Sequence, residues 1–396
     1  MQSDSHQYSL KHIFYSAFLI FTAILGIGFI IPFLPDFSKR VGSEAFVGLI
    51  YSGFAFARLF AVPLSSMISD KIGRKPVIIV GLIIYSVTSF LYVISHDLVS
   101  LFFVRLVHGL ASSMILPVSF AYALDYTKPG KEGFSASILG GSLLLGFGLG
   151  PVIGGFIGDQ LGENYAFYFM GSMGIFSLIY SSIFMVDRNV QTKKSQEKII
   201  DMIKEIFSSR IFITAFTIWF FIMFQRGVVI SYFPLFLENS GFTKTSVGFF
   251  LTIYAILSSL LQYASGSFVD KFSNKFVPSF IFAIVSYCLL FPFYFGQNGF
   301  VIFSAILSGV MSSMVYPFIM AELGAEAKKK QKIGGTIGFL DWAFSLGNIL
   351  GPTSMGLVSK YTGINLMFVV LCFFGFISLA IIYAVYKRSE KNSISY

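Results

Sequence analysis

The sequence predicts an all-α membrane protein with twelve transmembrane helices, arranged as two pseudo-symmetric six-helix bundles. Three observations support this fold class: a scarcity of charge, twelve long apolar stretches and an internal repeat of half the chain. Of the 396 residues, 55% are hydrophobic and 12% are charged, and the mean hydropathy is +0.78. Soluble domains carry about 25% charged residues. So few charges cannot cover a water-facing surface, and we expect the lipid bilayer to be the solvent.

The composition also excludes several functions. The net charge is +9, but the basic residues lie in short loops between apolar runs, so we do not expect a nucleic-acid partner. Cys288 and Cys372 lie in separate apolar segments, and the four histidines do not cluster at ligand spacing. We therefore expect no metal site and no cofactor. No nucleophile, metal set or acid–base pair indicates an enzyme.

Each apolar stretch is long enough to cross about 30 Å of hydrocarbon, which takes about 20 helical residues. The stretches must be helices because lipid offers no partner for an open backbone group. The first is too long for a removable signal peptide, and no small-residue cleavage site follows it. The predicted spans are 13–31, 47–66, 77–94, 101–122, 135–157, 165–186, 211–237, 247–269, 278–295, 300–321, 335–358 and 364–386.

Basic residues predict the orientation, because Lys and Arg accumulate in cytoplasmic loops. With both termini inside, 21 of the 28 basic residues lie on the cytoplasmic side and four outside, the other three being within spans. The four outer ones are Lys39, Arg40, Lys244 and Lys360. We therefore expect a multi-pass protein of a cell membrane, bacterial in origin, with cytoplasmic termini. The hydrophilic stretch 187–210 is predicted to be a cytoplasmic linker between bundles 1–186 and 211–396.

The two halves of the chain repeat each other. Shifted by 200 residues, the segment GLASSMILP from Gly109 falls on GVMSSMVYP from Gly309. Asp70 likewise falls on Asp270, and one residue further along a second Gly-Pro pair matches the first. Two similar bundles imply a pseudo-two-fold axis along the membrane normal. That arrangement places a solute site near the middle of the bilayer and permits alternating access.

The loop after the second span reads SMISDKIGRK from Ser66. Its acid can bond to helix-end amides, while its bases favour the cytoplasmic leaflet. The segment resembles the signature loop of the major facilitator superfamily, Gly-x-Leu-Ala-Asp-Arg-x-Gly-Arg-Lys, apart from serine in place of its first glycine. The resemblance implies the major facilitator fold, with Asp70, Gly73 and Arg74, and Asp270 in the repeat, as conformational gating residues. A plain solvated turn is the alternative.

The fifth span contains GFGLGPVIGG, whose small residues let helices approach closely and whose proline bends the helix. It resembles the Gly-x-x-x-Gly-Pro-x-x-Gly-Gly motif of the superfamily's exporters, especially the drug–proton antiporters. Serine replaces an upstream glycine of the longer motif. Tight packing without an export function is the alternative. The predicted helix-packing residues are Gly146, Gly150, Pro151, Gly154 and Gly155.

Ionisable groups inside spans cost about 2.5–3.5 kcal/mol each and are functional candidates. The segment RLVHG from Arg105 resembles the Arg-x-x-Gln-Gly motif of the same antiporters, which implies a role in proton coupling; His108 replaces the glutamine. A structural role for Arg105 and a packing role for His108 are the alternatives. Asp341 lies inside the eleventh span and Glu322 at the inner end of the tenth, and both carboxylates are candidate proton carriers. Glu322 could instead be an interfacial helix cap.

In this fold the first, fourth, seventh and tenth spans line the cavity. The predicted substrate-binding residues are Arg226, Gln225, Arg58 and Tyr316. A basic cavity favours an anionic or carboxylate-bearing solute. Alternatively, Arg226 is neutralised by another span or snorkels to the interface.

The resemblance implies a monomeric, proton-coupled transporter that exports a small amphipathic organic molecule by rocking of the two halves. The solute would be drug-like, or an anionic metabolite such as a carboxylate siderophore. A proton symporter that imports a sugar or organic acid, and a membrane sensor or enzyme of transporter ancestry, are the alternatives. Fold resemblance does not determine the substrate.

Overall fold

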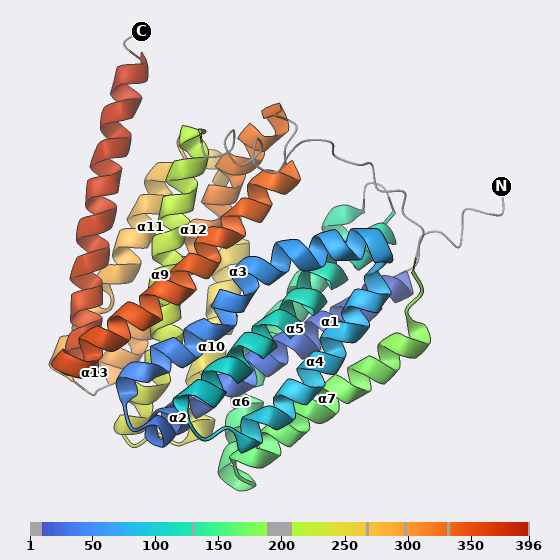
Figure 1. Ribbon diagram of the computed structural model, residues 1–396. Coiled ribbons are helices and arrows are strands. Elements are labelled where there is room, and N and C mark those ends of the chain that lie inside the picture. The colour runs from blue at the N-terminus through green and yellow to red at the C-terminus, as the bar shows by residue number, and fades with distance from the viewer. Residues whose placement is uncertain are drawn as a thin grey trace, which may run out of the picture. The chain divides into compact units, whose positions relative to one another are not determined.

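The computed structural model describes residues 10–128, 131–187, 208–266, 269–296, 299–330 and 333–394. Within these ranges every regular element is an α-helix or a short 3-10 helix (Figure 1). The long helices are α1 (Leu10–Ile30), α3 (Val47–Ile72), α4 (Arg74–Ile94), α5 (Leu98–Asp125), α6 (Glu132–Gln160), α7 (Glu163–Phe184), α9 (Arg210–Asn239), α10 (Lys244–Gly266), α11 (Phe276–Cys288), α12 (Gly299–Lys330) and α13 (Ile333–Ile394). The shorter elements are η1 (Ile31–Phe33), α2 (Leu34–Val41), η2 (Glu44–Phe46), η3 (Val269–Lys271) and η4 (Phe291–Phe295).

The described helices include eleven that are long and apolar enough to cross a membrane. The last of them, Leu340–Ala384, has 45 residues and would be about 68 Å long as one straight helix. It is not straight, because Gly363 inside α13 has a φ of 77° and joins two successive helices. Figure 1 shows α13 turning back on itself. Counting those two helices separately gives twelve spans, and the predicted fold class is confirmed.

The chain divides into two compact units. Unit 1 contains Met1–Lys194 together with Leu237–Thr252, and unit 2 contains Ser195–Phe236 together with Ile253–Tyr396. In unit 1, α1 packs chiefly on α6, α3 on α5, and α4 on α5 and α7. In unit 2, α11 packs on α12 and α13. Most of the predicted linker lies outside the described residues.

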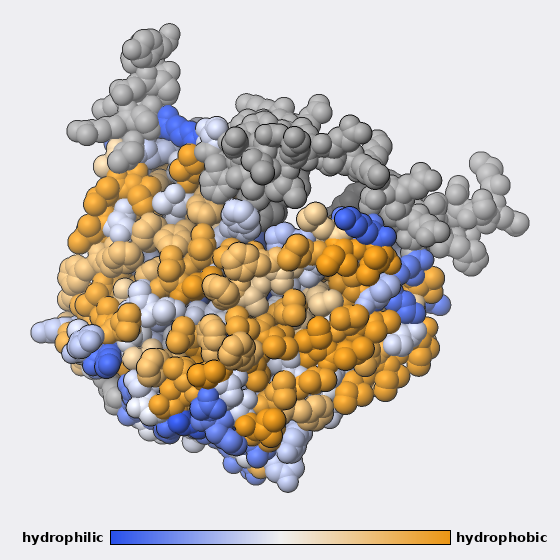
Figure 2. All heavy atoms as spheres, viewed as in Figure 1, coloured by the Kyte–Doolittle hydropathy of each residue, from blue (hydrophilic) through white to orange (hydrophobic). Residues whose placement is uncertain are grey.

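The surface of unit 1 is apolar along the helix sides. On α3, Phe56, Phe60 and Leu64 follow one another at four-residue spacing and are exposed, Phe60 by 58%. Side chains four residues apart share one face of a helix, so this face is suited to contact with lipid. On the side shown in Figure 2, apolar residues cover the helix flanks and hydrophilic residues gather near the helix ends. The helix ends are therefore suited to the polar boundaries of the bilayer.

Two helix ends show how the sequence sets the boundaries. Asp97 begins α5 by accepting hydrogen bonds from the amides of Ser100 and Val99 and from the Ser100 hydroxyl. These bonds, led by those to Ser100, lower the pKa of the Asp97 carboxyl. At the other boundary, α3 runs further than predicted, through Ile72. Asp70 therefore lies in the last turn of a helix and not in a loop.

Candidate functional site

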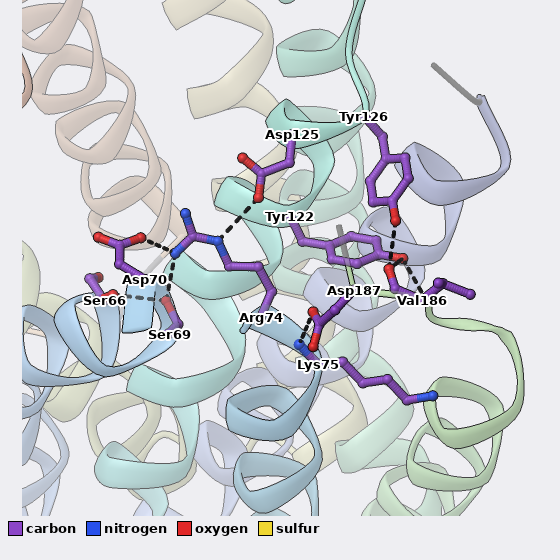
Figure 3. A network of polar contacts seen from close by, with 10 residues as sticks. All are labelled: Ser66, Ser69, Asp70, Arg74, Lys75, Tyr122, Asp125, Tyr126, Val186 and Asp187. Carbon is purple, nitrogen blue, oxygen red and sulfur yellow. Dashed lines mark hydrogen bonds and ion pairs between the residues drawn. The ribbon is translucent and has the colours of Figure 1, made fainter. Parts of the chain in front are cut away.

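Arg74 lies at the first position of α4 and joins three helices of unit 1 (Figure 3). Its Nε donates to Asp125 Oδ2 at the end of α5, at 3.2 Å. Its Nη1 donates to Ser69 Oγ at 2.7 Å and to Asp70 Oδ1, both on α3. The Arg74 side chain is only 15% exposed. We call Ser69, Asp70, Arg74 and Asp125 the Arg74 network; it holds the ends of α3 and α5 to the start of α4.

Gly73 makes the turn between α3 and α4 possible. Its φ is 102°, and an added Cβ would lie 2.5 Å from Asp187 Oδ2. Asp187 accepts a hydrogen bond from the Lys75 amide at 2.8 Å, and a carboxylate at a helix N-terminus interacts favourably with the helix dipole. The hydroxyls of Tyr122 and Tyr126 donate to the carbonyl of Val186, next to Asp187. The segment after α7 is thereby attached to both α4 and α5, as Figure 3 shows.

The corresponding end of unit 2 is built differently. Asn274 stands where the repeat places arginine; its Nδ2 donates to the Tyr386 hydroxyl and its Oδ1 accepts from the Phe276 amide. Glu322 Oε1 accepts from the Lys275 amide at 3.0 Å. Glu322 thus accepts a hydrogen bond from a backbone amide at the start of α11, as Asp187 does at the start of α4. This contact favours the helix-cap alternative for Glu322. The side chain of Asp270 lies outside the described residues.

The glycines of the fifth span lie where α6 packs on α1. A Cβ at Gly146 would lie 2.9 Å from the Ile24 side chain, and one at Gly154 would lie 3.0 Å from the Phe29 backbone. Between them, Gly150 and Pro151 lie against Gly28 of α1. Any larger residue in this row would force the two helices apart.

A second face of the same motif meets the start of α10. A Cβ at Gly155 would lie 2.3 Å from the Lys244 carbonyl, and one at Gly248 would lie 2.3 Å from the Pro151 carbonyl. Asp159, at the end of α6, accepts from the amides of Lys244 and Thr245 and from the Thr245 hydroxyl. Within unit 1, the motif and Asp159 therefore attach the first turn of α10 to α6.

Ion pairs lie around the contact between α6 and the first turn of α10. They are near the start of α3, whereas the Arg74 network is at its end. Lys244 Nζ lies 3.2 Å from Asp36 Oδ2, and Lys39 pairs with Glu238. Arg40 pairs with Glu163 at 2.5 Å. Lys39, Arg40 and Lys244 are three of the four basic residues predicted to lie on the outer side of the membrane. Their pairing gives each a structural partner within unit 1.

Three nitrogen-bearing side chains of unit 1 surround the ring of Phe54 on α3. The guanidinium carbons of Arg105 and Arg58 lie 5.2 and 5.8 Å from its centroid, and the His108 ring lies 5.3 Å away. Arg105 Nε and Nη2 donate to two successive carbonyls of α3 at 3.2 Å each. Arg58 Nη1 donates to the Ser112 hydroxyl of α5 at 3.3 Å. The structure thus brings together a predicted substrate-binding residue and two predicted proton-coupling residues.

In unit 2 the neighbours Gln225 and Arg226 have different environments. Gln225 is 1% exposed; its Nε2 donates to the Ser286 carbonyl and its Oε1 accepts from the Ser286 hydroxyl. Its amide joins α9 to α11 through both of its polar atoms. Arg226 is half-buried, and within the described part of the chain no carboxylate forms an ion pair with it.

Tyr316 packs against Trp219, with ring centroids 5.0 Å apart. The half-buried Asp341 of α13 lies close enough to act electrostatically on the Tyr316 hydroxyl. Among the described residues Asp341 forms no ion pair. Unit 2 therefore presents one acidic group beside two aromatic rings.

Sequence reasoning missed Asp125, Asp159 and Asp187. Each accepts hydrogen bonds from a partner far along the chain, at separations of 51, 85–86 and 112 residues. No local motif marks them. The one available signal is that each lies within three residues after the end of a predicted span.

The comparisons with known proteins agree with this architecture. The family model described as Major Facilitator Superfamily matches residues 16–296 and 220–395. An uncharacterised MFS-type transporter of Methanocaldococcus jannaschii is 27% identical over 365 residues, which cover 90% of this chain and 94% of the relative. Quinolone resistance protein NorA of Staphylococcus aureus is 27% identical over 355 residues, which cover 87% of this chain and 89% of NorA.

Solved transporters have the same fold. A bacterial homologue of the human lysosomal transporter Spinster, in an inward-facing and unoccupied conformation, has a TM-score of 0.80 at 15% identity and covers 96% of both chains. The nucleoside transporter NupG has a TM-score of 0.77 at 15% identity, covering 96% of this chain and all of NupG (100%). At this level of identity the similarity concerns the fold alone.

Proposed function

The chain belongs to the Major Facilitator Superfamily, whose members are transporters and not enzymes, and we propose that it exports a small amphipathic organic solute in exchange for protons. The observation that carries the export direction is the similarity to a quinolone resistance protein over nearly nine-tenths of the chain. The packing of the glycine-proline motif between α1 and α10 in unit 1 supports it. The two units rock between inward-open and outward-open states in a cell membrane, with both termini in the cytoplasm, and the chain works as a monomer.

Asp341 is the proton carrier in this proposal. An ionised carboxylate inside a span is costly unless it is paired, and among the described residues Asp341 lacks an ionic partner. Binding a proton removes that cost, and release of the proton restores it, so the charge of Asp341 can follow the conformational cycle. The adjacent rings of Trp219 and Tyr316 offer an apolar wall for an amphipathic solute.

Reconstituted protein tests this function directly. Liposomes containing a pH-sensitive dye and the purified chain are exposed to ethidium, norfloxacin or citrate, and internal pH is recorded. We expect at least one of these solutes to drive a proton flux, and we expect Asp341→Asn to abolish it. Asp97→Asn makes the same chemical change at an exposed position and should leave the flux intact.

Two results would count against these assignments. Loss of flux in Glu322→Gln together with normal flux in Asp341→Asn would transfer the carrier role to Glu322. Proton movement in the direction of the solute, and not against it, would replace export by the symport alternative.

A further inference from the structure

The side chains around Phe54 in unit 1 contain three nitrogen atoms that are buried and have no hydrogen-bond partner: Arg105 Nη1, His108 Nε2 and Arg58 Nε. Arg105 is 2% exposed and His108 is 0% exposed. Within the described residues, no carboxylate forms an ion pair with either arginine. The cluster is therefore a buried positive charge whose hydrogen-bonding capacity is only partly used.

Such an arrangement is energetically unfavourable by itself. A buried unpaired donor loses its hydration without replacement, and a buried charge without a counter-charge loses more. Two α3 carbonyls, the rings of Tyr51 and Phe54 and the nearby hydroxyl of Tyr92 offset part of the cost for Arg105. None of these partners carries a negative charge. An anion that reached the cluster would supply the missing negative charge and the missing hydrogen-bond acceptors.

The geometry of His108 makes it a suitable second donor. The Tyr92 hydroxyl lies 3.2 Å from His108 Nδ1. When that hydroxyl donates to Nδ1, the neutral imidazole carries its proton on Nε2, which is the unpartnered atom. Arg105 precedes His108 by three residues on α5, so both side chains lie on one face of the helix. Each of these two side chains thus has one unpartnered nitrogen that can donate to an acceptor oxygen.

The ring of Phe54 is buried and lies within 6 Å of the guanidinium groups of both arginines. The backbones cannot adjust here, because Gly109 of α5 already lies against the Phe54 carbonyl, where an added Cβ would be 2.3 Å away. Entry of an anion would therefore require rotation of the Phe54 side chain. Arg58 is half-buried and is the most accessible of the three basic groups.

We propose that Phe54, Arg58, Arg105 and His108 form the binding site for a carboxylate group of the transported solute. Arg58 attracts the carboxylate, the Phe54 ring turns aside and stacks on the apolar part of the solute, and Arg105 with His108 binds the two oxygens. The inference rests on the proposed transport function and narrows its substrate class to amphipathic carboxylates. All four residues that would bind the carboxylate of the solute belong to unit 1.

Binding to the purified full-length chain in detergent tests the site. The probes are 2-naphthoate, its neutral analogue 2-naphthamide, and the apolar cation tetraphenylphosphonium. We expect 2-naphthoate to raise the unfolding temperature in a saturable manner, and we expect 2-naphthamide at the same concentrations to have no such effect. The two aromatic groups are alike, so the difference isolates the carboxylate.

Variants then locate the effect. Arg58→Gln and Arg105→Lys should each weaken 2-naphthoate binding about ten- to hundredfold, the usual effect of losing a charged hydrogen bond. Lysine keeps the buried charge and can still bond to the α3 carbonyls, but it lacks the second planar donor, so Arg105→Lys separates binding from folding. Arg210→Gln removes an arginine outside the cluster and should bind 2-naphthoate as the wild type does.

The possible results are distinct from those of the flux experiment. Equal stabilisation by 2-naphthoate and 2-naphthamide, or unchanged binding in both cluster variants, would overturn the carboxylate site. Stabilisation by tetraphenylphosphonium alone, with solute-driven proton flux present, would overturn the site and leave the transport function standing. Saturable 2-naphthoate binding that is lost in the variants, without proton flux for any solute, would support the site and count against proton coupling.

Discussion

Replacing Gly150 by alanine should destabilise unit 1, because the added methyl group has no space. It would lie 2.7 Å from the Leu25 carbonyl and 2.9 Å from Gly28 Cα, whereas ordinary contacts lie at 3.4–4 Å. Both obstacles are backbone atoms of α1, so relief requires separating two helices by about 0.7 Å or more. Overpacking of this kind costs about 1–3 kcal/mol.

The same helix offers a matched control. Gly141 also lies in α6, but nothing lies within 4 Å of the Cβ that alanine would add there. Alanine is a better helix former than glycine by about 1 kcal/mol, and both substitutions gain that preference. The difference between Gly150→Ala and Gly141→Ala therefore isolates the steric cost, about 1–3 kcal/mol.

Unfolding by SDS in mixed micelles, followed by circular dichroism, measures this difference. We expect Gly150→Ala to unfold at a lower SDS fraction than Gly141→Ala. Gly28→Ala crowds the same contact from the α1 side, so the double variant should lose less stability than the sum of the two single variants. Equal unfolding of Gly150→Ala and Gly141→Ala would refute the claim that the motif sets the α1–α6 distance.

Two further predictions concern the carboxylates that join helices. Asp125→Asn should cost about 1.5–3 kcal/mol in the same unfolding assay, because it removes a charged acceptor of a largely buried arginine; an unchanged stability would mean that Arg74 is held by Ser69 and Asp70 alone. Asp159→Asn should speed hydrogen exchange at the Thr245 amide, about tenfold for each 1.4 kcal/mol by which the local structure is destabilised, as measured by mass spectrometry. Unchanged exchange would show that the glycine contacts alone hold the start of α10 in place.

The sequence predicts the helices of this protein well because their signal is local. Length and apolarity of each stretch suffice to identify a span, and the glycine at position 363 separates the last two. The packing motif is equally local, since its glycines lie close together on one helix. The Arg74 network was only partly predictable, because Asp70 and Arg74 are sequence neighbours while Asp125 comes from a helix 51 residues away.

Gln225 and Arg226, which are both predicted to bind substrate, show that adjacency in the sequence does not determine which way two side chains point. Consecutive helical residues point about 100° apart and do not share a face. Gln225 accordingly faces α11 and bonds to Ser286, whereas Arg226 is half-buried on another side of α9. Deciding which of the two faced a neighbouring helix required Ser286, which lies 61 residues away.

Comparison of the two units shows which features the internal repeat preserves. Pro151 of α6 lies against Gly28 in unit 1, and Pro352 of α13 lies against Gly227 in unit 2, with 2.8 and 3.0 Å to the added Cβ. The helix-packing contact is therefore the same in both halves. In each half it depends on a glycine that leaves room for the proline ring of the facing helix.

The charged contacts are not preserved in this way. The starts of α4 and α11 both receive a carboxylate, but from Asp187 after α7 in one unit and from Glu322 of α12 in the other. Arg74 is replaced by Asn274, whose amide donates to the hydroxyl of Tyr386. The amides at the start of a helix need a hydrogen-bond acceptor, but residues from different elements can supply it without a change of fold. The described part of unit 1 therefore has an arginine with two carboxylate partners, Asp70 and Asp125, at the position where unit 2 has Asn274.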